Sequence, residues 1–540
     1  MAIKHESRLP HRASVLLLLA LLGVNDLKAR TTHDDHSLGR VDFPVSCTAP
    51  AQEQFNGAMA LLHHMTYPQA REAFEKIIAA DPECAMAYWG VSMTLFQPLW
   101  PTRPSPAALA HGWSSVQKAK QLHPGSREQL FIAAAEAFFA DPASTDYWQR
   151  IRRWEAATQK AYEQLPGDTE AALFYALAHL ATAPADASAR EHADASAAIL
   201  AAVYERHPDH PGAMHYLIHA NDVPGREREF LEVTRKYEEI APENPHALHM
   251  PTHIYTRLGD WDGVIKGNLR AANASLLHPA GPNGEYVWDE YPHAIEYLIY
   301  AYLQQGADKE ALAQLQRLQA AKNLEPTFKT AFHLASTQSR YALERHDWPA
   351  AARIQPRTPS SLDWDRFPWA EATAVFAHGL GAAHLGKGLE TQAAIDRLEA
   401  LESSTRKSGE ELFARNIQVL RLELTAWSIH ERGDRARSIE LMNEATALET
   451  ATPKHAVTPA PTLPARELLG DLYMDLEKSE LAQAAYEGSL KAYPNRFNSL
   501  LGAARAAREM GDDQTAKAYE ERLRTVGSKG DRGSELKEKP

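Results

Sequence analysis

Two histidine pairs stand 34 residues apart in this sequence. His215 and His219 are separated by four residues, and so are His249 and His253, so each member of the first pair recurs in the second at the same step. On a helix, residues four apart lie one turn apart on the same face. Two imidazoles in that arrangement can bind one metal ion, as they do in helical zinc sites. The pattern therefore predicts two helices with matching metal-binding faces, whose paired histidines are the expected ligands.

Further polar residues accompany these pairs. Asp222 follows the first pair, His246 precedes the second, and the next segment carries His293, Glu296 and Tyr300. We expect these five residues to border the site. There a carboxylate can complete the coordination shell or hold a ligand histidine by its second nitrogen.

The types of donor atom narrow the choice of metal. Imidazole and carboxylate without thiolate suit a divalent transition metal such as zinc, copper(II), iron or nickel better than copper(I). The segment His-Tyr-Leu-Ile-His has Tyr216 where the zinc-peptidase helix has glutamate, so that protease class is not indicated. The sequence contains no nucleophile elbow, phosphate loop or dinucleotide fingerprint.

The residues that flank the histidines repeat at the same step. Pro208 and Pro242 are 34 residues apart, as are Gly225 and Gly259. Alanine-rich segments with a period of about 3.6 residues run through the whole chain, and alternating β-type patterns are almost absent. The elements that carry the histidines are therefore expected to be helices, and the fold class to be all-α.

Signature residues resemble those of the tetratricopeptide-repeat (TPR) family, whose unit is 34 residues long. The residues concerned are Gln69-Ala70, Ala73-Phe74 and Asp81-Pro82, then Leu258-Gly259-Asp260-Trp261, and then Tyr473, Ala482, Tyr486, Pro494 and Gly511-Asp512. The resemblance covers most of residues 51–526 and is weak across 310–450. It implies an α-solenoid of antiparallel helix hairpins that form a superhelix with a concave groove. It also implies that a peptide or partner protein binds in that groove.

In TPR arrays the first helix of each unit lines the groove, and this register directs the histidines toward it. We number three successive units so that the turn glycine, Gly225, Gly259 or Gly306, is position 15 of each. The groove-facing residues are then His215, His219 and Asp222 at positions 5, 9 and 12, His246, His249 and His253 at 2, 5 and 9, and His293, Glu296 and Tyr300 at 2, 5 and 9. Neighbouring helices lie about 8–10 Å apart, so imidazoles of two units can reach a shared ion. We therefore expect His215, His219, His249 and His253 to form one site.

Changes in composition divide the chain into segments. We expect a signal peptide at 1–29, an N-terminal segment at 30–50, a TPR-like solenoid with the histidine-rich groove at 51–352, a linker at 353–368, degenerate helical repeats at 369–451, a proline-rich linker at 452–464, a C-terminal TPR pair at 465–526 and a disordered tail at 527–540. An irregular stretch, His278–Tyr291, directly follows the histidine repeats. It is a candidate lid or wall of the site, and an ordinary surface loop is the alternative.

The N-terminal residues predict export. Lys4, Arg8 and Arg12 precede the apolar run Ala13–Val24, and Leu27-Lys28-Ala29 fits a cleavage site. The run is too short to span a bilayer well, so the mature chain is expected to be secreted or periplasmic, without a membrane span.

Cysteine usage and charge refine this expectation. Cys47 and Cys84 are the only cysteines, and an oxidising compartment favours a disulfide between them. Two buried free thiols are the alternative. The formal net charge is −13 and no basic block occurs, which argues against nucleic acid and anionic lipid as partners.

Three functions fit the sequence. The first is an exported solenoid whose groove binds a transition metal or a small ligand. The second is a metal-free adaptor that binds a peptide or protein, with the histidine pairs as a duplicated surface feature. The third is a metal-dependent hydrolase or oxidase in which Asp222, Glu296 or Tyr300 takes part in proton transfer.

Overall fold

The described part of the chain is all-α. The structure is a computed structural model, and it describes residues 38–100, 103–141, 146–281 and 283–532, all within one compact unit. Within these ranges the β-type pairings are two isolated bridges, Ala280 with Tyr286 and Val287 with Leu324. None of the helices in the described ranges is both long enough and apolar enough to cross a bilayer. The signal peptide predicted at 1–29 lies outside the described residues.

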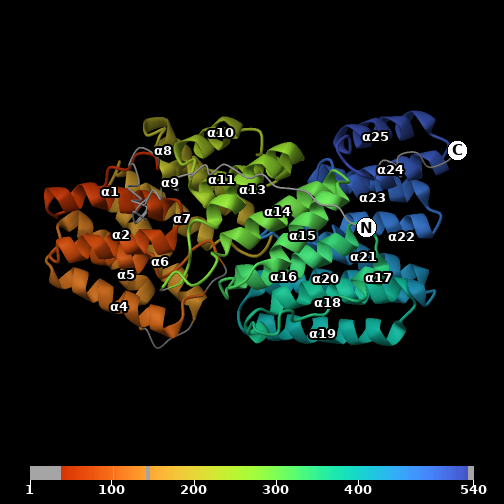
Figure 1. Cartoon of the computed structure of the whole chain (residues 1–540), viewed down its shortest axis with the longest axis horizontal. Coiled ribbons are helices and arrows are strands. Elements are labelled where there is room, and N and C mark those ends of the chain that lie inside the picture. The colour runs from red at the N-terminus through yellow and green to blue at the C-terminus, as the bar shows by residue number, and fades with distance from the viewer. Residues whose placement is uncertain (1–37, 101–102, 142–145, 282, 533–540) are drawn as a thin grey trace, which may run out of the picture. The chain divides into compact units, whose positions relative to one another are not determined.

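The helices follow one another along the chain (Figure 1). They are α1 (Ala49–His63), α2 (Tyr67–Ala80), α3 (Ala85–Met93), α4 (Pro106–Gln121), α5 (Ser126–Phe139), α6 (Tyr147–Gln164), α7 (Thr169–Ala181), α8 (Ala189–Arg206), α9 (Pro211–Asn221), α10 (Leu231–Ile240), α11 (Pro245–His249), α12 (Pro251–Leu258), α13 (Trp261–Ser275), α14 (Glu290–Gln304), α15 (Asp308–Ala320), α16 (Phe328–Leu343), α17 (Trp348–Ala351), the 3₁₀ turn η2 (Trp364–Arg366), α18 (Pro368–His384), α19 (Gly388–Lys407), α20 (Glu411–Glu431), α21 (Arg435–Thr450), α22 (Ala465–Asp475), α23 (Ser479–Ala492), α24 (Phe497–Glu509) and α25 (Asp513–Val526). Longer connections precede α4, α14, α18 and α22.

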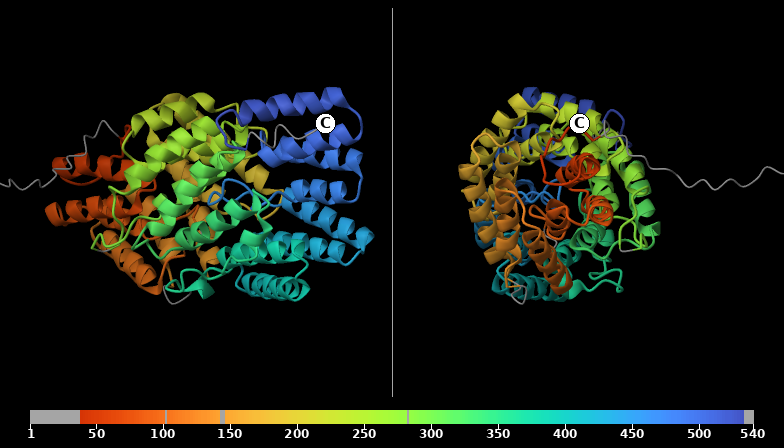
Figure 2. Two further views of the ribbon diagram at one scale, coloured as in Figure 1. Left: turned by 45° about the vertical axis from the view of Figure 1, so that its right-hand side comes forward. Right: turned by 90° about the vertical axis from the view of Figure 1, so that its left-hand side faces the viewer.

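Consecutive helices pack as hairpins, and the hairpins stack in chain order. α9 packs on α10, α11 and α12 pack on α13, and α14 packs on α15. The first helices of these units also contact one another, α9 with α12, α11 with α14, and α14 with α16. Figure 2 shows the successive helices from two further sides. The predicted all-α solenoid of helix hairpins is confirmed.

Proline and a capping side chain begin the histidine-bearing helices. Pro211 opens α9, and the His210 side chain accepts a hydrogen bond from the Gly212 amide at 3.2 Å. Pro245 opens α11, and Asn244 accepts from the Ala247 amide at 3.0 Å. Proline suits the first helical position because its missing N–H would have no partner there.

A second proline breaks the next histidine helix. Pro251 cannot donate a helical hydrogen bond, so α11 ends at His249 and α12 starts at Pro251. His249 and His253 therefore lie on either side of the break. Their ring centroids are nevertheless 4.9 Å apart, so the expected one-turn proximity survives it.

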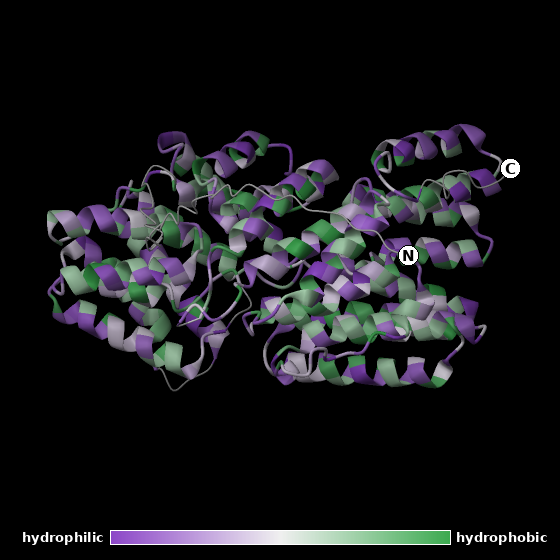
Figure 3. Cartoon of the chain, in the orientation of Figure 1, coloured by the Kyte–Doolittle hydropathy of each residue, from purple (hydrophilic) through white to green (hydrophobic). Residues whose placement is uncertain are grey.

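Small residues allow the paired helices to approach closely. Most helices carry both apolar and polar residues (Figure 3). In the C-terminal pair, a Cβ atom at Gly470 or Gly502 would lie 2.6 Å or 2.4 Å from the ring of Tyr486. A larger side chain at either position would push the helices apart.

The predicted disulfide between Cys47 and Cys84 is confirmed. It ties the segment before α1 to the residue that precedes α3. A cross-link that closes a loop of this length stabilises a fold by roughly 3–4 kcal/mol when it is unstrained.

Contacts between distant helices depart from the nearest-neighbour packing of a solenoid. α1 contacts α9, and α14 contacts α24. The Trp261 indole donates to the carbonyl of Asn495 at 3.0 Å, and the Phe497 amide donates to Gln304 at 3.1 Å. The histidine-bearing units are therefore held from both ends of the chain.

The residues after α25 also pack against the middle units. Asp531 accepts a hydrogen bond from the Asp308 amide at 2.9 Å, and the Arg532 guanidinium donates to the Asp308 carboxylate at 2.9 Å. The expected disordered tail is thus corrected for 527–532, because these polar residues find partners on α15. Residues 533–540 lie outside the described ranges.

The contact between Gly259 and the C-terminal units gives a stability prediction. Gly259 has φ +66°, and a Cβ atom there would lie 2.5 Å from the carbonyl oxygen of Pro494. Gly433 has φ +89° with open space around it. Alanine at a positive φ costs roughly 1–2 kcal/mol, so Gly433→Ala should lose about that much and Gly259→Ala clearly more. Denaturant unfolding that gave equal losses would contradict this close packing.

Candidate metal centre

Six imidazoles from three successive units meet in two groups of three. The first triad is His215 and His219 of α9 with His246 of α11. The second triad is His249 of α11, His253 of α12 and His293 of α14. Within each triad the candidate donor atoms lie within 4.8 Å of one another.

In each triad two donor nitrogens are already at the separation of two ligands on one ion. The Nε2 atoms of His215 and His246 are 3.1 Å apart, and those of His249 and His253 are 3.0 Å apart. Two nitrogens bound at 2.0–2.1 Å, with octahedral to tetrahedral angles, are about 2.8–3.4 Å apart. The third imidazole of each triad needs only a small side-chain rotation to join them.

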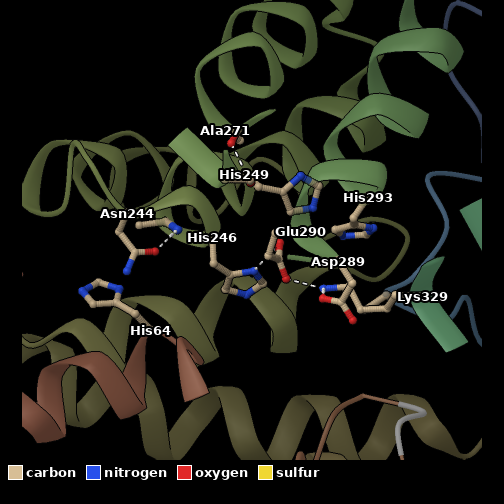
Figure 4. Close-up of polar contacts among 12 residues, drawn as sticks. His64, Asn244, His246, His249, Ala271, Asp289, Glu290, His293 and Lys329 are labelled. Carbon is tan, nitrogen blue, oxygen red and sulfur yellow. Dashed lines mark hydrogen bonds and ion pairs between the residues drawn. The ribbon is translucent and has the colours of Figure 1, made fainter. Parts of the chain in front are cut away.

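Hydrogen bonds fix the tautomers of the first triad. His215 donates from Nδ1 to the carbonyl oxygen of His63 at 2.6 Å. The Nδ1 atom of His246 lies 3.2 Å from the carboxylate of Glu290 (Figure 4). Burial opposes ionisation of Glu290, but the Lys329 ammonium holds the pKa of that carboxyl well below its ordinary value. Both acceptors lack a proton, so each Nδ1 carries one, and in the neutral imidazole, which is the form that binds a metal, Nε2 then presents a lone pair.

The second triad has the same arrangement. His253 donates from Nδ1 to Asp222 at 2.9 Å. His249 donates from Nδ1 to the amide oxygen of Asn268 at 2.7 Å. The NH₂ group of Asn268 donates to the carbonyl of Val264 at 2.9 Å, which directs its oxygen toward the imidazole. Here too the two Nε2 lone pairs face each other.

A chain of polar groups orients His293, the third member of the second triad. Its Nδ1 atom lies 3.0 Å from Nε2 of His333, whose own Nδ1 bonds the carboxylate of Glu296. Arg340 donates to the other oxygen of Glu296 at 2.9 Å. This leaves Nε2 of His293 buried without a partner, and Nε2 of His219 in the first triad is in the same condition.

Burial favours the neutral form of five imidazoles, those of His215, His219, His249, His253 and His293. It lowers the pKa of His253 to about 4. For the other four, neighbouring histidines add to the effect of burial. The pKa is lowered well below its ordinary value for His215, His219, His249 and His293. A neutral imidazole is the form that binds a metal.

The facing lone pairs offer a place for a cation. Two buried acceptors about 3 Å apart with no proton between them repel each other, and a buried polar atom without a partner is unfavourable. The Tyr297 hydroxyl reaches Nε2 of His253 only at 3.5 Å. An ion at the centre of each triad would satisfy the converging nitrogens.

A third cluster shows the contrast. His63 bonds Tyr216 at 3.0 Å through Nδ1 and Glu170 at 2.9 Å through Nε2. His210 bonds the second oxygen of Glu170 at 3.0 Å through Nε2 and accepts from the Gly212 amide through Nδ1. Every ring nitrogen has a partner here, so this cluster needs no ion.

The grouping of the histidines differs from the sequence prediction. His215 pairs with His246 rather than with His249, and His249 approaches His293, with ring centroids 4.2 Å apart. The reason is an offset of about one helical turn between neighbouring units, which brings position 5 of one unit beside position 2 of the next. His246 and His293 are therefore members of the triads and not border residues. The single predicted site becomes two adjacent ones.

The three other predicted site residues, Asp222, Glu296 and Tyr300, lie at different distances from the triads. Asp222 holds His253 by its second nitrogen, as expected. Glu296 does not contact a triad histidine directly, but bonds His333, which in turn contacts His293. Tyr300 does not reach the histidines, because its hydroxyl bonds Arg496 at 3.2 Å, and Tyr297 takes the place beside the second triad.

Trp100 lies across both triads. Its ring centroid is 5.5 Å from that of His246 and 5.9 Å from that of His293. The Lys329 ammonium lies over the same ring, 4.3 Å from its centroid. Sequence reasoning missed this role of Trp100, because a tryptophan in a helical protein is usually a core residue.

The segment predicted as a proline-rich linker, 452–464, covers the second triad. The Lys454 ammonium lies 2.8 Å from Asp222, and the Ala456 carbonyl lies 3.5 Å from the Tyr297 hydroxyl. Arg340 donates to Thr458 at 2.8 Å. The insertion His278–Tyr291 likewise acts as a wall, since Glu290 at its end holds His246.

Comparison with known proteins gives structural matches only. Neither a scan against protein-family models nor a search of curated proteins returns a match. Among solved structures 175 chains match. One is a crystal structure of the APC/C hetero-tetramer Cut9–Hcn1, with 12% sequence identity over 91% of this chain and 89% of that chain and a TM-score of 0.33.

His455, in the covering segment, predicts a loss of stability in acid. It accepts from the Val457 amide at 3.0 Å, packs against Trp369 and Phe413, and burial lowers its pKa to about 3. Below pH 6.5 the His455 imidazole binds a proton in the unfolded chain, whereas in the folded chain it stays neutral until the pH approaches 3. Stability is therefore lost as pH falls toward 3, by about 2 kcal/mol at pH 5 from this residue.

His455→Asn tests this prediction, because asparagine keeps an acceptor for the amide but does not titrate. Denaturant unfolding of the metal-free protein at pH 7 and pH 5 should show the wild type losing about 2 kcal/mol more than the variant. Equal losses would show that His455 is protonated in the folded chain.

Proposed function

We propose that this protein binds two transition-metal ions, one in each histidine triad. The observation that carries the proposal is the pair of facing Nε2 lone pairs in each triad, 3.1 Å apart in the first and 3.0 Å apart in the second. Histidines that bind metals commonly donate their other ring N–H to a carboxylate or carbonyl group. His215, His246 and His253 do so.

Each ion would keep an open coordination position. Three imidazoles per ion leave at least one position for water or another ligand, which is typical of catalytic and ligand-binding sites rather than of closed structural ones. The imidazole ligands suit zinc, copper, iron or nickel. A hydrolytic or oxidative activity would be an extension of this metal binding.

The structure supports the alternative function, a metal-free adaptor that binds a peptide or protein, less well than metal binding. A peptide bound along them would need their inner faces, but His215, His249 and His293 are fully buried. The covering segment is also tied down there by the Lys454–Asp222 ion pair. Burial of this kind supports an internal site for small ligands.

Metal stoichiometry tests the proposal. After loading with a single metal and removal of the excess, elemental analysis should find two ions per chain. His219→Ala and His293→Ala should each retain about one ion, because each removes one ligand from one triad. The substituted Nε2 atoms have no partner within the fold, so circular dichroism should show unchanged helix content.

His179→Ala provides the control. His179 belongs to a half-buried cluster with Glu155 and His192, and its Nδ1 bonds Glu155 at 2.7 Å. This variant should keep two ions. A wild-type protein that retains no metal after loading with zinc, copper, iron and nickel in turn would overturn the proposal.

We also propose that the protein is exported, to a secreted or periplasmic location. The Cys47–Cys84 disulfide supports this, because disulfides persist in oxidising compartments. Mass spectrometry of protein recovered outside the cytoplasm should find an N-terminus near Arg30 and a linked pair of cysteine peptides. Recovery of the chain only in the cytoplasm with Met1 intact would contradict export.

A further inference from the structure

The charged residues around the two triads balance one another. Four carboxylates and four cations surround the imidazoles, and no side chain among them is more than 10% exposed. The carboxylates are Asp222, Asp289, Glu290 and Glu296. The cations are Arg257, Lys329, Arg340 and Lys454.

Each of these carboxylates is already engaged with a cation. Asp222 lies 2.8 Å from both Arg257 and Lys454, and Asp289 lies 3.1 Å from Lys329. Glu290 also pairs with Lys329, and Glu296 pairs with Arg340 at 2.9 Å. A fifth carboxyl group, Glu325, accepts a hydrogen bond from the Asp289 amide at 3.4 Å, but burial and the neighbouring Asp289 carboxylate raise its pKa to about 8, so it is mostly uncharged at pH 7.

Two divalent ions would bring four positive charges into this neutral shell. Their imidazole ligands are uncharged, and an excess of buried charge is strongly unfavourable unless it is paired. The engaged carboxylates cannot bridge the ions without leaving their own cations unpaired. An anionic ligand from outside the protein would supply the compensating charge without breaking these ion pairs.

The two triads are adjacent, so one ligand can serve both. The ring centroids of His219 and His253, one from each triad, are 6.0 Å apart, and those of His246 and His249 are 6.2 Å apart. These separations overlap those within the triads, which reach 6.5 Å between His219 and His246. Trp100 packs edge-on against members of both triads and walls one side.

We infer that the two ions form one dinuclear centre that binds a small inorganic anion as a bridge between them. This inference rests on the proposed metal binding. The chemical class is a compact anion with one or two donor atoms, such as hydroxide or azide. A compact anion suits this position because Trp100 packs against both triads and the histidines are buried.

Copper(II) and azide provide the test. Each copper(II) ion has one unpaired electron, and two ions that share a bridging anion can couple antiferromagnetically, which removes their electron paramagnetic resonance signal. With azide present, wild-type protein loaded with two copper(II) ions should give far less signal than two isolated copper(II) ions. It should bind one azide per copper pair, with a new charge-transfer absorption band.

His293→Ala is the matched control, because it should hold a single copper in the intact first triad. Its signal should keep full intensity with azide present. A chelator specific for copper(I) should detect none in either sample, which excludes reduction as the cause of signal loss.

The outcomes separate the two proposals. Two bound copper ions that keep their full signal with azide would overturn the dinuclear centre and leave the proposed metal binding intact. Failure to bind copper or any other transition metal would overturn both.

Discussion

The site depends on one constraint, the commitment of the Nδ1 protons to acceptors outside the triads. A carbonyl, two carboxylates, an amide oxygen and a further imidazole receive these protons from His215, His246, His253, His249 and His293. Every Nε2 lone pair so defined is turned inward. The same contacts set the orientation of the rings. They also disfavour the tautomer with the proton on Nε2, in which one histidine could donate a hydrogen bond to the next. A fold that provides these acceptors stabilises a cation-binding arrangement in preference to a hydrogen-bonded histidine cluster.

The acceptors come from widely separated parts of the chain, which explains the departures from simple solenoid packing. His63 reaches the first triad because α1 contacts α9, although seven helices separate them in the sequence. Glu290 arrives at the end of an insertion, and Lys454 from a proline-rich segment reinforces Asp222. C-terminal contacts at Gly259 and Gln304 hold the same units from the other side. In this molecule the repeats provide the histidines, and the long-range contacts orient them.

The two triads follow one rule. Each triad consists of the histidines at positions 5 and 9 of one unit and at position 2 of the next unit. The same offset between neighbouring units therefore produces both triads. A repeated unit thus generates a repeated site, and the two sites share an edge because the middle unit contributes to each. The balanced charges around them have a parallel consequence. Because the surrounding carboxylates are already paired with cations, an added anion would offset the charge of the proposed ions.

The sequence by itself determined the all-α repeat class, the 34-residue register, the disulfide partners and the neighbourhood of the histidines, with four of them expected in the site and His246 and His293 on its border. These follow from local periodicity, from the spacing of like residues and from a count of two cysteines. The grouping into triads was decided only by the tertiary structure, because the offset between stacked units depends on how helices pack and not on their spacing in the sequence. The roles of Trp100, His333, Lys329 and Lys454 were likewise invisible beforehand. Each is brought to the site by contacts between residues distant in sequence, and the chain around each resembles ordinary core, helix or linker.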